Sequence, residues 1–554
     1  MAARSRSRSP PAVDEIVPQP GLASDVQEET DDDLGFVEQC HSAGKVSRSL
    51  CWPHLDAGRP DGPTNYEAMH DWLQHMVKRI GQADPSGGCL ELLKRNLRRK
   101  VFLTTHYSGM GTAEMAAGLV ESGVFGHDPE MTAAAGSGSL FSVHAANECA
   151  PHAQEVLVAH RGAWAPRHVF GNLCFPVPVD LQEKWRRMLK AARRKVDETC
   201  EEGQCSSTQR ARMVERAGEH FVRVVLADLN NLTFCRDLKQ YCFKCKKFCV
   251  RFPSASSICD GVLVDISGST CVGFSKAGKR WAWLDDSAVP FMVWAWTMKS
   301  VRPQLILHEC VASFDPKVLD LTLNYQEPVP AYAISSVVFN ASDLGLPVSR
   351  VRRYTLCRSV SSGARVDYTY TNLAAVTFRR LLLDGGVYFR ASEAMLDEMN
   401  QKLATNCHLP PSNGGSRWPW SALLRVGQYQ RLQDARQNRK SDSPPETFCS
   451  ISQSLAFMSM SAVVPTMVTN SVIYRISNKP GEDRPATPLE CFAMQNIPAL
   501  LPEGHPAAKH FAFRGFVEKG SLTLGHCRLM TGNGMNLAAV GSVLCFGLAT
   551  IEFR

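Results

Sequence analysis

One cysteine of this chain stands in a setting that suits a nucleophile. Cys271 lies in the glycine- and serine-rich loop 268–275, directly after the apolar run Gly261–Ile266, and is followed by the basic stretch 276–280. The thiolate is the reactive form of a cysteine, and nearby positive charge favours it. Most of the 20 cysteines are expected to be buried apolar side chains, but this loop predicts a nucleophile at Cys271.

A second loop joins a strand, two glycines and a helix. The β-rich run Val101–His106 is followed by Tyr107-Ser-Gly-Met-Gly111 and then by a helical pattern over 113–120. Glycines let the backbone approach a ligand closely, and the N-terminus of a helix favours negative charge. Glu148 follows the next such run, Phe141–Asn147, where a carboxylate can accept hydrogen bonds from both hydroxyl groups of a ribose. Together the two turns predict a cofactor that contains a nucleoside.

These residues need a framework that brings the ends of several strands together. Short apolar runs recur along the chain, and helix-length segments separate most of them. The runs are Val101–His106, Phe141–Asn147, Val222–Leu226, Gly261–Ile266, Leu305–Cys310 and Ala333–Phe339. This alternation predicts an α/β sheet with crossover helices, and such sheets bind ligands beyond the carboxyl ends of their strands.

Six segments resemble, in order, motifs of the cytosine C5 DNA methyltransferase family, and the resemblance extends from about Val101 to Gly547. Besides the glycine turn, they are the cysteine loop with its Ala277–Arg280 continuation, Leu305–Val311, Asn340–Arg352, Arg484–Pro498 and Gly532-Asn533. Any one of them alone is a weak signal, whereas six in the right order form a strong one. The resemblance implies a Rossmann-like S-adenosylmethionine-dependent methyltransferase sheet with an inserted, smaller target-recognition domain.

The resemblance also implies the chemistry. Cys271 would add to C6 of a cytosine flipped out of the base stack, so that C5 can take a methyl group. Glu309 would hold or donate a proton at N3 and Arg352 would bind O2, so that the two stabilise the charge on the ring. Arg350, the other arginine of its motif, is placed in the catalytic set with them.

S-adenosylmethionine is the cofactor that the resemblance implies. Its expected neighbours are Tyr107, Ser108, Gly109, Met110 and Gly111 of the turn, Glu148 at the ribose, Asn172 at the adenine and Asn533 near the methionine end. The adenine contact has an alternative, because Asp228 also follows an apolar run, Val222–Leu226. Asn172 is preferred because its distance along the chain from Glu148 is the more usual one in the family.

The chain departs from the family's pattern beside several of these groups. The family has proline where this chain has Thr270, and glutamine where it has Val272. It has asparagine at the position of Cys310, glutamine at that of Val348 and an acid at that of Thr105. Neighbouring side chains fix the geometry of a catalytic group, so these substitutions bear on turnover. The leading hypothesis is an active DNA cytosine C5 methyltransferase. A catalytically impaired relative that binds DNA or cofactor, and a tRNA methyltransferase on the same fold, are the alternatives.

The chain divides into four expected parts. Residues 1–60 contain an Arg-Ser run and an acidic patch, which predict a disordered tail. Residues 61–358 are expected to form a catalytic core with an insertion at about 176–256. Residues 359–483 occupy the position of the target-recognition domain and carry a basic helix, and residues 484–554 return to the core. The Arg-Ser run favours a nuclear protein, although a merely solubilising tail is an equal alternative.

Composition leaves several classes of partner open. A net charge of +7 permits a polyanion such as DNA, and no apolar run is long and uninterrupted enough to suggest a membrane span. The sequence gives no indication of the oligomeric state. A thiol cluster is formed by Cys242, Cys245 and Cys249, with Cys235 upstream. Four thiolates can bind zinc, but the spacing lacks a second Cys-x-x-Cys pair, so reduced thiols without a metal are the preferred interpretation.

Overall fold

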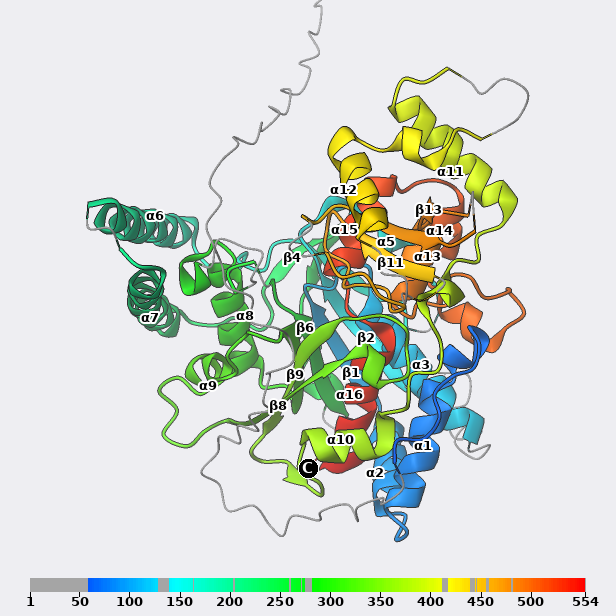
Figure 1. Ribbon diagram of the computed structural model, residues 1–554. Coiled ribbons are helices and arrows are strands. Elements are labelled where there is room, and N and C mark those ends of the chain that lie inside the picture. The colour runs from blue at the N-terminus through cyan, green and yellow to red at the C-terminus, as the bar shows by residue number, and fades with distance from the viewer. Residues whose placement is uncertain are drawn as a thin grey trace, which may run out of the picture. The chain divides into compact units, whose positions relative to one another are not determined.

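A seven-stranded sheet lies at the centre of the computed structural model (Figure 1). Its strands are β1 (Val101–His106), β2 (Phe141–Asn147), β3 (His168–Phe170), β6 (Val262–Gly268), β7 (Leu305–Val311), β8 (Tyr332–Asn340) and β9 (Val351–Ser359). Across the sheet they lie in the order β3-β2-β1-β6-β7-β9-β8. Neighbouring strands from β3 to β7 are parallel, whereas β9 is antiparallel to both β7 and β8.

The structure describes residues 58–127, 139–162, 164–202, 205–258, 261–270, 272–274, 281–410, 417–438, 444, 446–454, 458–479 and 482–553. Residues 1–57, most of the expected disordered tail, lie outside the described part of the chain. Cys271 also lies outside it.

The order of the sheet reverses once along the chain. After β1 the chain adds β2 and β3 on one side, and it then crosses to add β6 and β7 on the other side. Sheets of this kind bind ligands where the order reverses, beyond the carboxyl ends of the strands, which here are those of β1 and β6. A parallel sheet of this order, with an antiparallel β9 before its last strand, is the Rossmann-like methyltransferase sheet. The predicted fold class is confirmed.

Each strand divides its side chains between two helix layers. Val101 and Leu103 of β1 belong to one buried cluster, while Phe102 between them belongs to the other, and β7 repeats this alternation. Because both faces are covered, β1, β6 and β7 are buried along almost their whole length. This is why most of them are recognisable in the sequence as continuous apolar runs.

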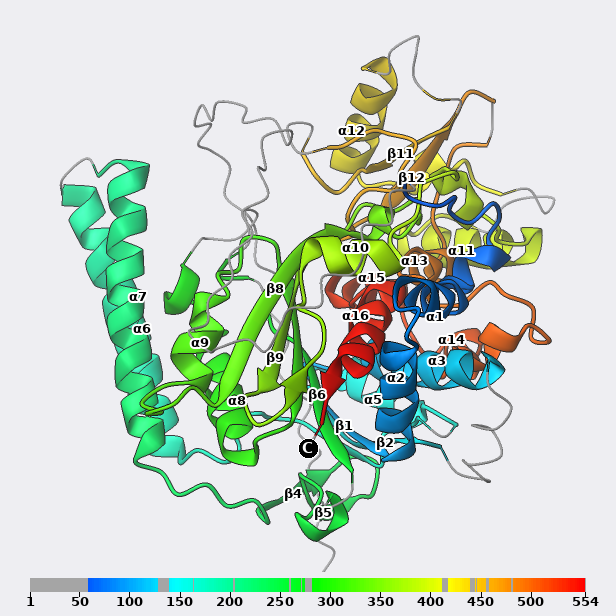
Figure 2. The ribbon, with the colours of Figure 1, turned by 90° about the horizontal axis from the view of Figure 1, so that it is seen from below.

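A layer of helices covers each face of the sheet (Figure 2). One layer contains α1 (Trp72–Ala83), α2 (Gly88–Arg98), α3 (Thr112–His127) and α16 (Leu537–Thr550). The other contains α8 (Ala288–Val301) and α9 (Lys317–Leu323), with α6 (Val179–Glu202) and α7 (Ser207–Asn230) packed outside α8. The stretch Leu524–Thr550 is long and apolar enough to cross a membrane, but 94% of its most apolar part is buried inside the protein. Its composition is therefore that of a core helix.

One predicted strand is wrong. The apolar run Val222–Leu226 lies inside α7, where Phe221, Val222, Val225 and Leu229 are buried at helical spacing. The run marks the buried side of a helix rather than a strand. The other helices are α5 (Pro151–Ala159), α10 (Tyr370–Thr377), α11 (Glu393–Asn406), α12 (Val426–Gln437), α13 (Pro488–Met494), α14 (Arg514–Glu518) and α15 (Leu524–Asn533). The other strands are β4 (Lys239–Cys242), β5 (Lys247–Val250), β10 (Gly363–Ala364), β11 (Glu446–Ser450), β12 (Ile473–Ser477), β13 (Arg484–Pro485) and β14 (Ile551–Glu552).

The expected target-recognition region, residues 359–483, contains a small core of its own. β11, β12 and β13 form an antiparallel sheet, and α12 packs on it through Leu432 and Ala435. In contrast, α10 packs against α1, and its Leu373 and Val376 belong to the main core. The domain boundary at residue 359 stays a prediction, and α10 beyond it packs with the catalytic core.

A buried ion pair lies at the start of the return segment. Arg484 donates two hydrogen bonds to Glu490, at 2.8 and 2.7 Å, and the two side chains are 8% and 0% exposed. The same carboxylate accepts hydrogen bonds from the backbone N–H groups of Thr487 and Ala391, each at 2.8 Å. Because Ala391 belongs to the 359–483 region, one carboxylate connects that region to α13.

Glu490→Gln is expected to lower the free energy of unfolding by about 3 kcal/mol, because it leaves a buried guanidinium without its counter-charge. Glu398→Gln is the matched control, since Glu398 pairs with Lys402 on the surface of α11 and such pairs contribute less than about 1 kcal/mol. Chemical denaturation of both variants measures the difference. Equal destabilisation by the two variants would contradict the anchoring role of Glu490.

Candidate active site

Ser108 ties the carboxyl ends of β1 and β2 together. Its backbone N–H donates to the Asn147 carbonyl at 3.1 Å, and the Asn147 N–H donates to the Ser108 hydroxyl, also at 3.1 Å. The Ser108 hydroxyl also lies 2.8 Å from the Thr105 hydroxyl. The glycine turn after β1 is therefore held directly beside the turn that carries Glu148.

The turn has a backbone shape that glycine allows. Gly109 and Gly111 have φ angles of 55° and 86°. At Gly111 a Cβ would lie 2.1 Å from the ring of His160, whose Nε2 is hydrogen-bonded to the Met110 carbonyl at 2.9 Å. At Gly109 a Cβ would meet nothing within 4 Å, so the space over this glycine is open to a ligand.

Glu148 faces the glycine turn. The Gly109 N–H donates to Oε2 of Glu148 at 2.8 Å, and the Ala150 N–H donates to Oε1 at 2.9 Å. These two backbone donors fix the orientation of the carboxylate. Each oxygen retains acceptor capacity, so Glu148 can still receive hydrogen bonds from two hydroxyl groups, as a ribose contact requires.

Tyr107, which is partly buried, and Met110, which is buried, support the turn. The ring of Tyr107 packs against the buried cluster on the α8 side of the sheet, and burial raises the pKa of its phenol well above the ordinary value. Met110 is fully buried. Both predicted cofactor neighbours thus contribute apolar packing at the turn.

A second carboxylate lies under the turn, at a position that the sequence does not signal. Glu114, in the first turn of α3, is fully buried and accepts a hydrogen bond from the Thr105 hydroxyl at 2.5 Å. Burial raises the pKa of Glu114 to about 7. The Thr105 hydroxyl thus links the end of β1 to the first turn of α3.

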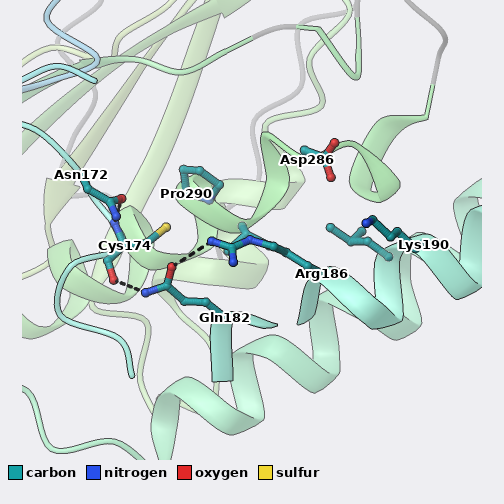
Figure 3. A pocket seen from close by; sticks show the side chains of 9 residues that line it. Asn172, Cys174, Gln182, Arg186, Lys190, Asp286 and Pro290 are labelled. Atoms are coloured by element: carbon teal, nitrogen blue, oxygen red, sulfur yellow. Dashed lines mark hydrogen bonds between the residues drawn. The ribbon is translucent and has the colours of Figure 1, made fainter. Parts of the chain in front are cut away.

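A cavity of about 420 Å³ opens beside Asn172 (Figure 3). Asn172 follows β3, and its side-chain oxygen accepts a hydrogen bond from the Cys174 N–H at 2.9 Å. Gln182 of α6 donates to the Cys174 carbonyl at 3.0 Å, and Arg186 donates to the Gln182 side chain at 3.4 Å. The size of this cavity suits a small-molecule ligand, and its lining beyond Asn172 and Cys174 comes from α6 and from residues around the start of α8.

Asp228, the alternative adenine contact, lies elsewhere. Its carboxylate, near the end of α7, accepts hydrogen bonds from Lys184 at 2.8 Å and from the Trp185 indole at 2.9 Å. Asp228 follows a helical run rather than a strand, which removes the reason for considering it. The contact of Asn172 with adenine stays a prediction.

Glu309 and Arg352 face each other across β7 and β9. Nε of Arg352 lies 3.1 Å from Oε1 of Glu309, and the two side chains are 13% and 7% exposed. Gly268, at the end of β6, is in register with Glu309, and a Cβ there would lie 3.3 Å from Oε2 of Glu309. The strand that leads into the Cys271 loop therefore ends beside this acid–arginine pair.

Cys271 lies outside the residues that the structure describes, so its role rests on the sequence. On its amino side, the hydroxyl of Ser269 is buried and lies 2.8 Å from Nε2 of His308 on β7. Burial lowers the pKa of His308 to about 3, which keeps the ring neutral. The start of the cysteine loop is thus fastened to the strand that carries Glu309.

Arg350 is held at a different place from Arg352. It is 3% exposed, and its guanidinium donates to the carbonyls of Met467, Gly532 and Gly534 at 3.2, 3.2 and 2.5 Å. These contacts connect the start of β9 to the return segment. The catalytic role implied for Arg350 stays a prediction, and the observed contacts are those of a positioning residue.

Asn533 is exposed at the end of α15, next to both loops of the site. A Cβ on Gly534 would lie 2.5 Å from Cε of Met110 in the glycine turn, and a Cβ on Gly268 would lie 2.6 Å from Cε of Met535. The segment after Asn533 thus packs on the loop of β1 and on the loop of β6. Among the described residues, this segment and the strand ends bring the predicted cofactor neighbours to one edge of the sheet.

Asp265 connects the two central strands beneath these loops. Its buried carboxylate accepts hydrogen bonds from the Thr104 hydroxyl at 2.7 Å, from Nδ1 of His106 at 2.6 Å and from the Trp294 indole at 3.1 Å. Burial lowers the pKa of His106, so a neutral ring donates this hydrogen bond. β1, β6 and α8 therefore share one buried acceptor.

Comparison with known proteins finds no family model and no curated protein that matches the chain. Among solved structures, the chain is similar to the Dnmt2 methyltransferase of S. pombe, with 12% identity over 80% of this chain and 98% of that one, and a TM-score of 0.37. It is similar to a putative prophage-encoded DNA modification methyltransferase (E. coli), with 13% identity over 81% and 98%, and a TM-score of 0.37. A third is the Entamoeba histolytica methyltransferase EhMeth, with 9% identity over 81% and 97%, and a TM-score of 0.40. At these TM-scores the likeness carries no argument about activity, and the fold assignment rests on the order and directions of the strands.

Glu114→Gln is expected to change how stability depends on pH. The pKa of Glu114 in the folded protein, about 7, lies above its ordinary value of 4.5. Below pH 4.5 the carboxyl group is neutral in both the folded and the unfolded protein, so its burial carries no cost of ionisation. As the pH rises from 4.5 to about 7, the natural protein loses stability, because the unfolded chain releases this proton first. A glutamine does not ionise, so the free energy of unfolding of the variant is expected to rise relative to that of the natural protein between pH 5 and pH 8. Denaturant unfolding of both proteins at these pH values measures this gain.

The matched control is Glu155→Gln, at an exposed position of α5. Its stability is expected to follow that of the natural protein at both pH values. A constant difference between Glu114→Gln and the natural protein from pH 5 to pH 8 would contradict the buried, neutral state of Glu114.

Proposed function

We propose that this protein is an S-adenosylmethionine-dependent cytosine C5 methyltransferase that acts on DNA. The observation that carries the proposal is the buried Glu309–Arg352 pair beside Gly268, where the Cys271 loop begins. Addition of a nucleophile to a cytosine ring builds negative charge on the ring. A carboxyl group and a guanidinium fixed next to the nucleophile's loop suit the stabilisation of that charge.

The residues at the glycine turn fit S-adenosylmethionine. The open space over Gly109 leaves room for the ligand, and Glu148 is oriented with acceptors free for two ribose hydroxyls. The cavity beside Asn172 has the size of a small-ligand site. When bound, S-adenosylmethionine supplies an electrophilic methyl group on its sulfonium sulfur.

The proposed reaction proceeds through a covalent bond to Cys271. The thiolate sulfur bonds to C6 of cytosine, and the electron pair of the C5–C6 double bond becomes available at C5. C5 would take the methyl group from the sulfonium sulfur of the bound cofactor, with the methyl–sulfur bond breaking and its electron pair staying on that sulfur. A base then takes the C5 proton, and the sulfur leaves C6 with its electron pair. The C5–C6 double bond and the thiolate are thereby restored, and 5-methylcytosine is released.

Glu309 and Arg352 have separate roles in this scheme. While the thiolate attacks, Glu309 holds or donates a proton at N3, and Arg352 donates hydrogen bonds to O2. The ion pair between them fixes both side chains before the base enters. Arg350 acts indirectly, because its bonds to the carbonyls of Met467, Gly532 and Gly534 hold β9 against the return segment.

The proposed substrate is DNA, and the target base has to leave the duplex to reach Cys271. Exposed basic side chains on α6 offer contacts to phosphates, including Arg186, Arg187 and Lys190. The basic helix of the 359–483 region offers fewer, because Arg431 bonds to the Ile451 carbonyl and Arg436 pairs with Asp483. Location in the nucleus stays a prediction from the Arg-Ser run.

Cys271→Ala is expected to abolish transfer of tritiated methyl groups to DNA while cofactor binding persists, because only the covalent step needs the thiol. Cys407→Ala, which removes an exposed cysteine of the described chain, is the control and is expected to leave transfer unchanged. A filter-binding assay of both variants measures this. Methyl transfer by Cys271→Ala would refute the covalent mechanism.

Glu309→Gln is expected to lower kcat by about 10²–10⁴-fold, because an amide cannot donate a proton to N3. The affinity for S-adenosylhomocysteine is expected to stay unchanged, since Glu309 faces Arg352 and Gly268 rather than the glycine turn. Steady-state kinetics and calorimetric titration separate the two effects. A loss of cofactor affinity without a loss of kcat would contradict the proposed role of Glu309 at N3.

DNA containing 5-fluorocytosine tests for the impaired relative. Fluorine cannot leave as a proton does, so elimination is blocked and a protein–DNA adduct accumulates after methyl transfer. An adduct would exclude the impaired relative. If no adduct forms and cofactor binding is intact, the impaired relative is favoured. Methyl transfer to tRNA but not to DNA in the same assay would identify tRNA, rather than DNA, as the substrate.

A further inference from the structure

Four side chains that commonly bind metal ions meet at the β3 edge of the sheet. They are His168 of β3 and three cysteines of the β4–β5 hairpin, Cys242, Cys245 and Cys249. One donor atom from each lies within 4.8 Å of the donor atoms of the others. Cys242 and Cys249 are buried, and the other two are partly buried. Three cysteines and a histidine form one of the usual ligand sets of structural zinc.

Two distances within this cluster match those of a tetrahedral site. Nδ1 of His168 lies 3.4 Å from Sγ of Cys245 and 3.8 Å from Sγ of Cys242. Zinc bonds of about 2.3 Å to sulfur and about 2.0 Å to nitrogen place the ligand atoms of a tetrahedron roughly 3.5–3.8 Å apart. The side chains of His168, Cys242 and Cys245 therefore need little rearrangement to bind one ion.

The backbone around the cluster supports charged sulfur atoms. Sγ of Cys242 accepts hydrogen bonds from the N–H groups of Cys245 at 3.3 Å and Val169 at 3.4 Å. Lys246 follows Cys245 with a φ of 56°, and its N–H donates to the Cys242 carbonyl at 2.8 Å. Such bonds orient thiolate ligands and offset their charge. Lys244, Lys246 and Lys247 add positive charge close by.

We propose that His168, Cys242, Cys245 and Cys249 bind one Zn²⁺ ion. Thiolate ligands exclude Ca²⁺ and Mg²⁺, which take oxygen ligands. Four protein ligands fill a tetrahedral zinc ion and leave no position for water or substrate, so the site is structural. The expectation of metal-free thiols is replaced by this proposal.

The ligand set differs from the thiol cluster visible in the sequence. Cys235, the fourth thiol of that cluster, is exposed and is not among the four meeting side chains. His168 takes its place from a strand 74 residues before Cys242. A spacing of that length gives no metal-site signal in a sequence, and only the fold brings the histidine to the hairpin.

The zinc ion would fasten the hairpin to the strand that leads to Asn172. The Phe243 N–H donates to the Val169 carbonyl at 2.8 Å, and the Gln240 side chain donates to the Asn172 carbonyl at 3.1 Å. Loss of the ion would free the hairpin and with it the loop of Asn172. This consequence rests on the proposed function, whereas the metal site itself does not.

The metal content of the full chain tests the site directly. Protein purified without chelators is expected to contain one zinc ion per chain by elemental mass spectrometry, and Cys249→Ser and His168→Ala are expected to lose it. Cys235→Ser is the matched control and should keep the ion. His168→Cys should also keep it, which separates loss of a ligand from failure to fold.

Two outcomes would overturn the zinc site. One is natural protein that takes up no stoichiometric zinc when zinc is supplied under reducing conditions. The other is Cys235→Ser losing zinc while Cys249→Ser retains it. Substitution by Co²⁺ gives an independent readout, since thiolate-bound tetrahedral cobalt absorbs visible light and the Cys249→Ser protein should not show these bands.

The link to the cofactor loop has its own measurement. Folded but zinc-free protein is expected to bind S-adenosylhomocysteine about tenfold more weakly than the zinc-bound protein, roughly the loss of one hydrogen bond. Equal affinity would refute the link to Asn172 and leave the zinc site standing. No binding by either form would contradict the proposed function instead.

Discussion

The buried carboxylate of Asp265 is the interaction on which the site depends. It accepts hydrogen bonds from Thr104 and His106 of β1 and from Trp294 of α8, while belonging itself to β6. Loops that carry reactive groups leave the sheet immediately above it, on both sides of the point where the strand order reverses. An unpaired carboxylate in this position would be costly, so the shared acceptor favours the arrangement in which α8 packs against the paired strands β1 and β6. The glycine turn follows β1, and Gly268 lies at the end of β6.

The strands could be predicted where burial makes them apolar on both faces. Val101–His106 and Phe141–Asn147 coincide with β1 and β2, because every other side chain enters one helix layer and the rest enter the opposite layer. Val222–Leu226 could not be told apart from such a strand, since five apolar residues fit the buried side of a helix equally well. Its place in α7 follows from contacts with α8, which the local sequence does not contain.

The candidate site divides in the same way. The glycine turn and Glu148 are recognisable because each follows a strand, and Glu309 and Arg352 because each belongs to a motif. Glu114 and His168 are not, because their partners, Thr105 and the cysteine hairpin, are reached through the fold. Arg350 illustrates a third case, in which a motif names the residue and only its contacts show that it holds two segments together.

The packing of Met110 on Gly534 and of Gly268 on Met535 has a consequence for synthesis of the chain. The two halves of the candidate site come from residues separated by more than a hundred positions, but both lean on a segment made after residue 530. A nascent chain that has already produced the whole central sheet still lacks this support. The glycine turn and the end of β6 should therefore be fully packed only after residues 534–550 have left the ribosome.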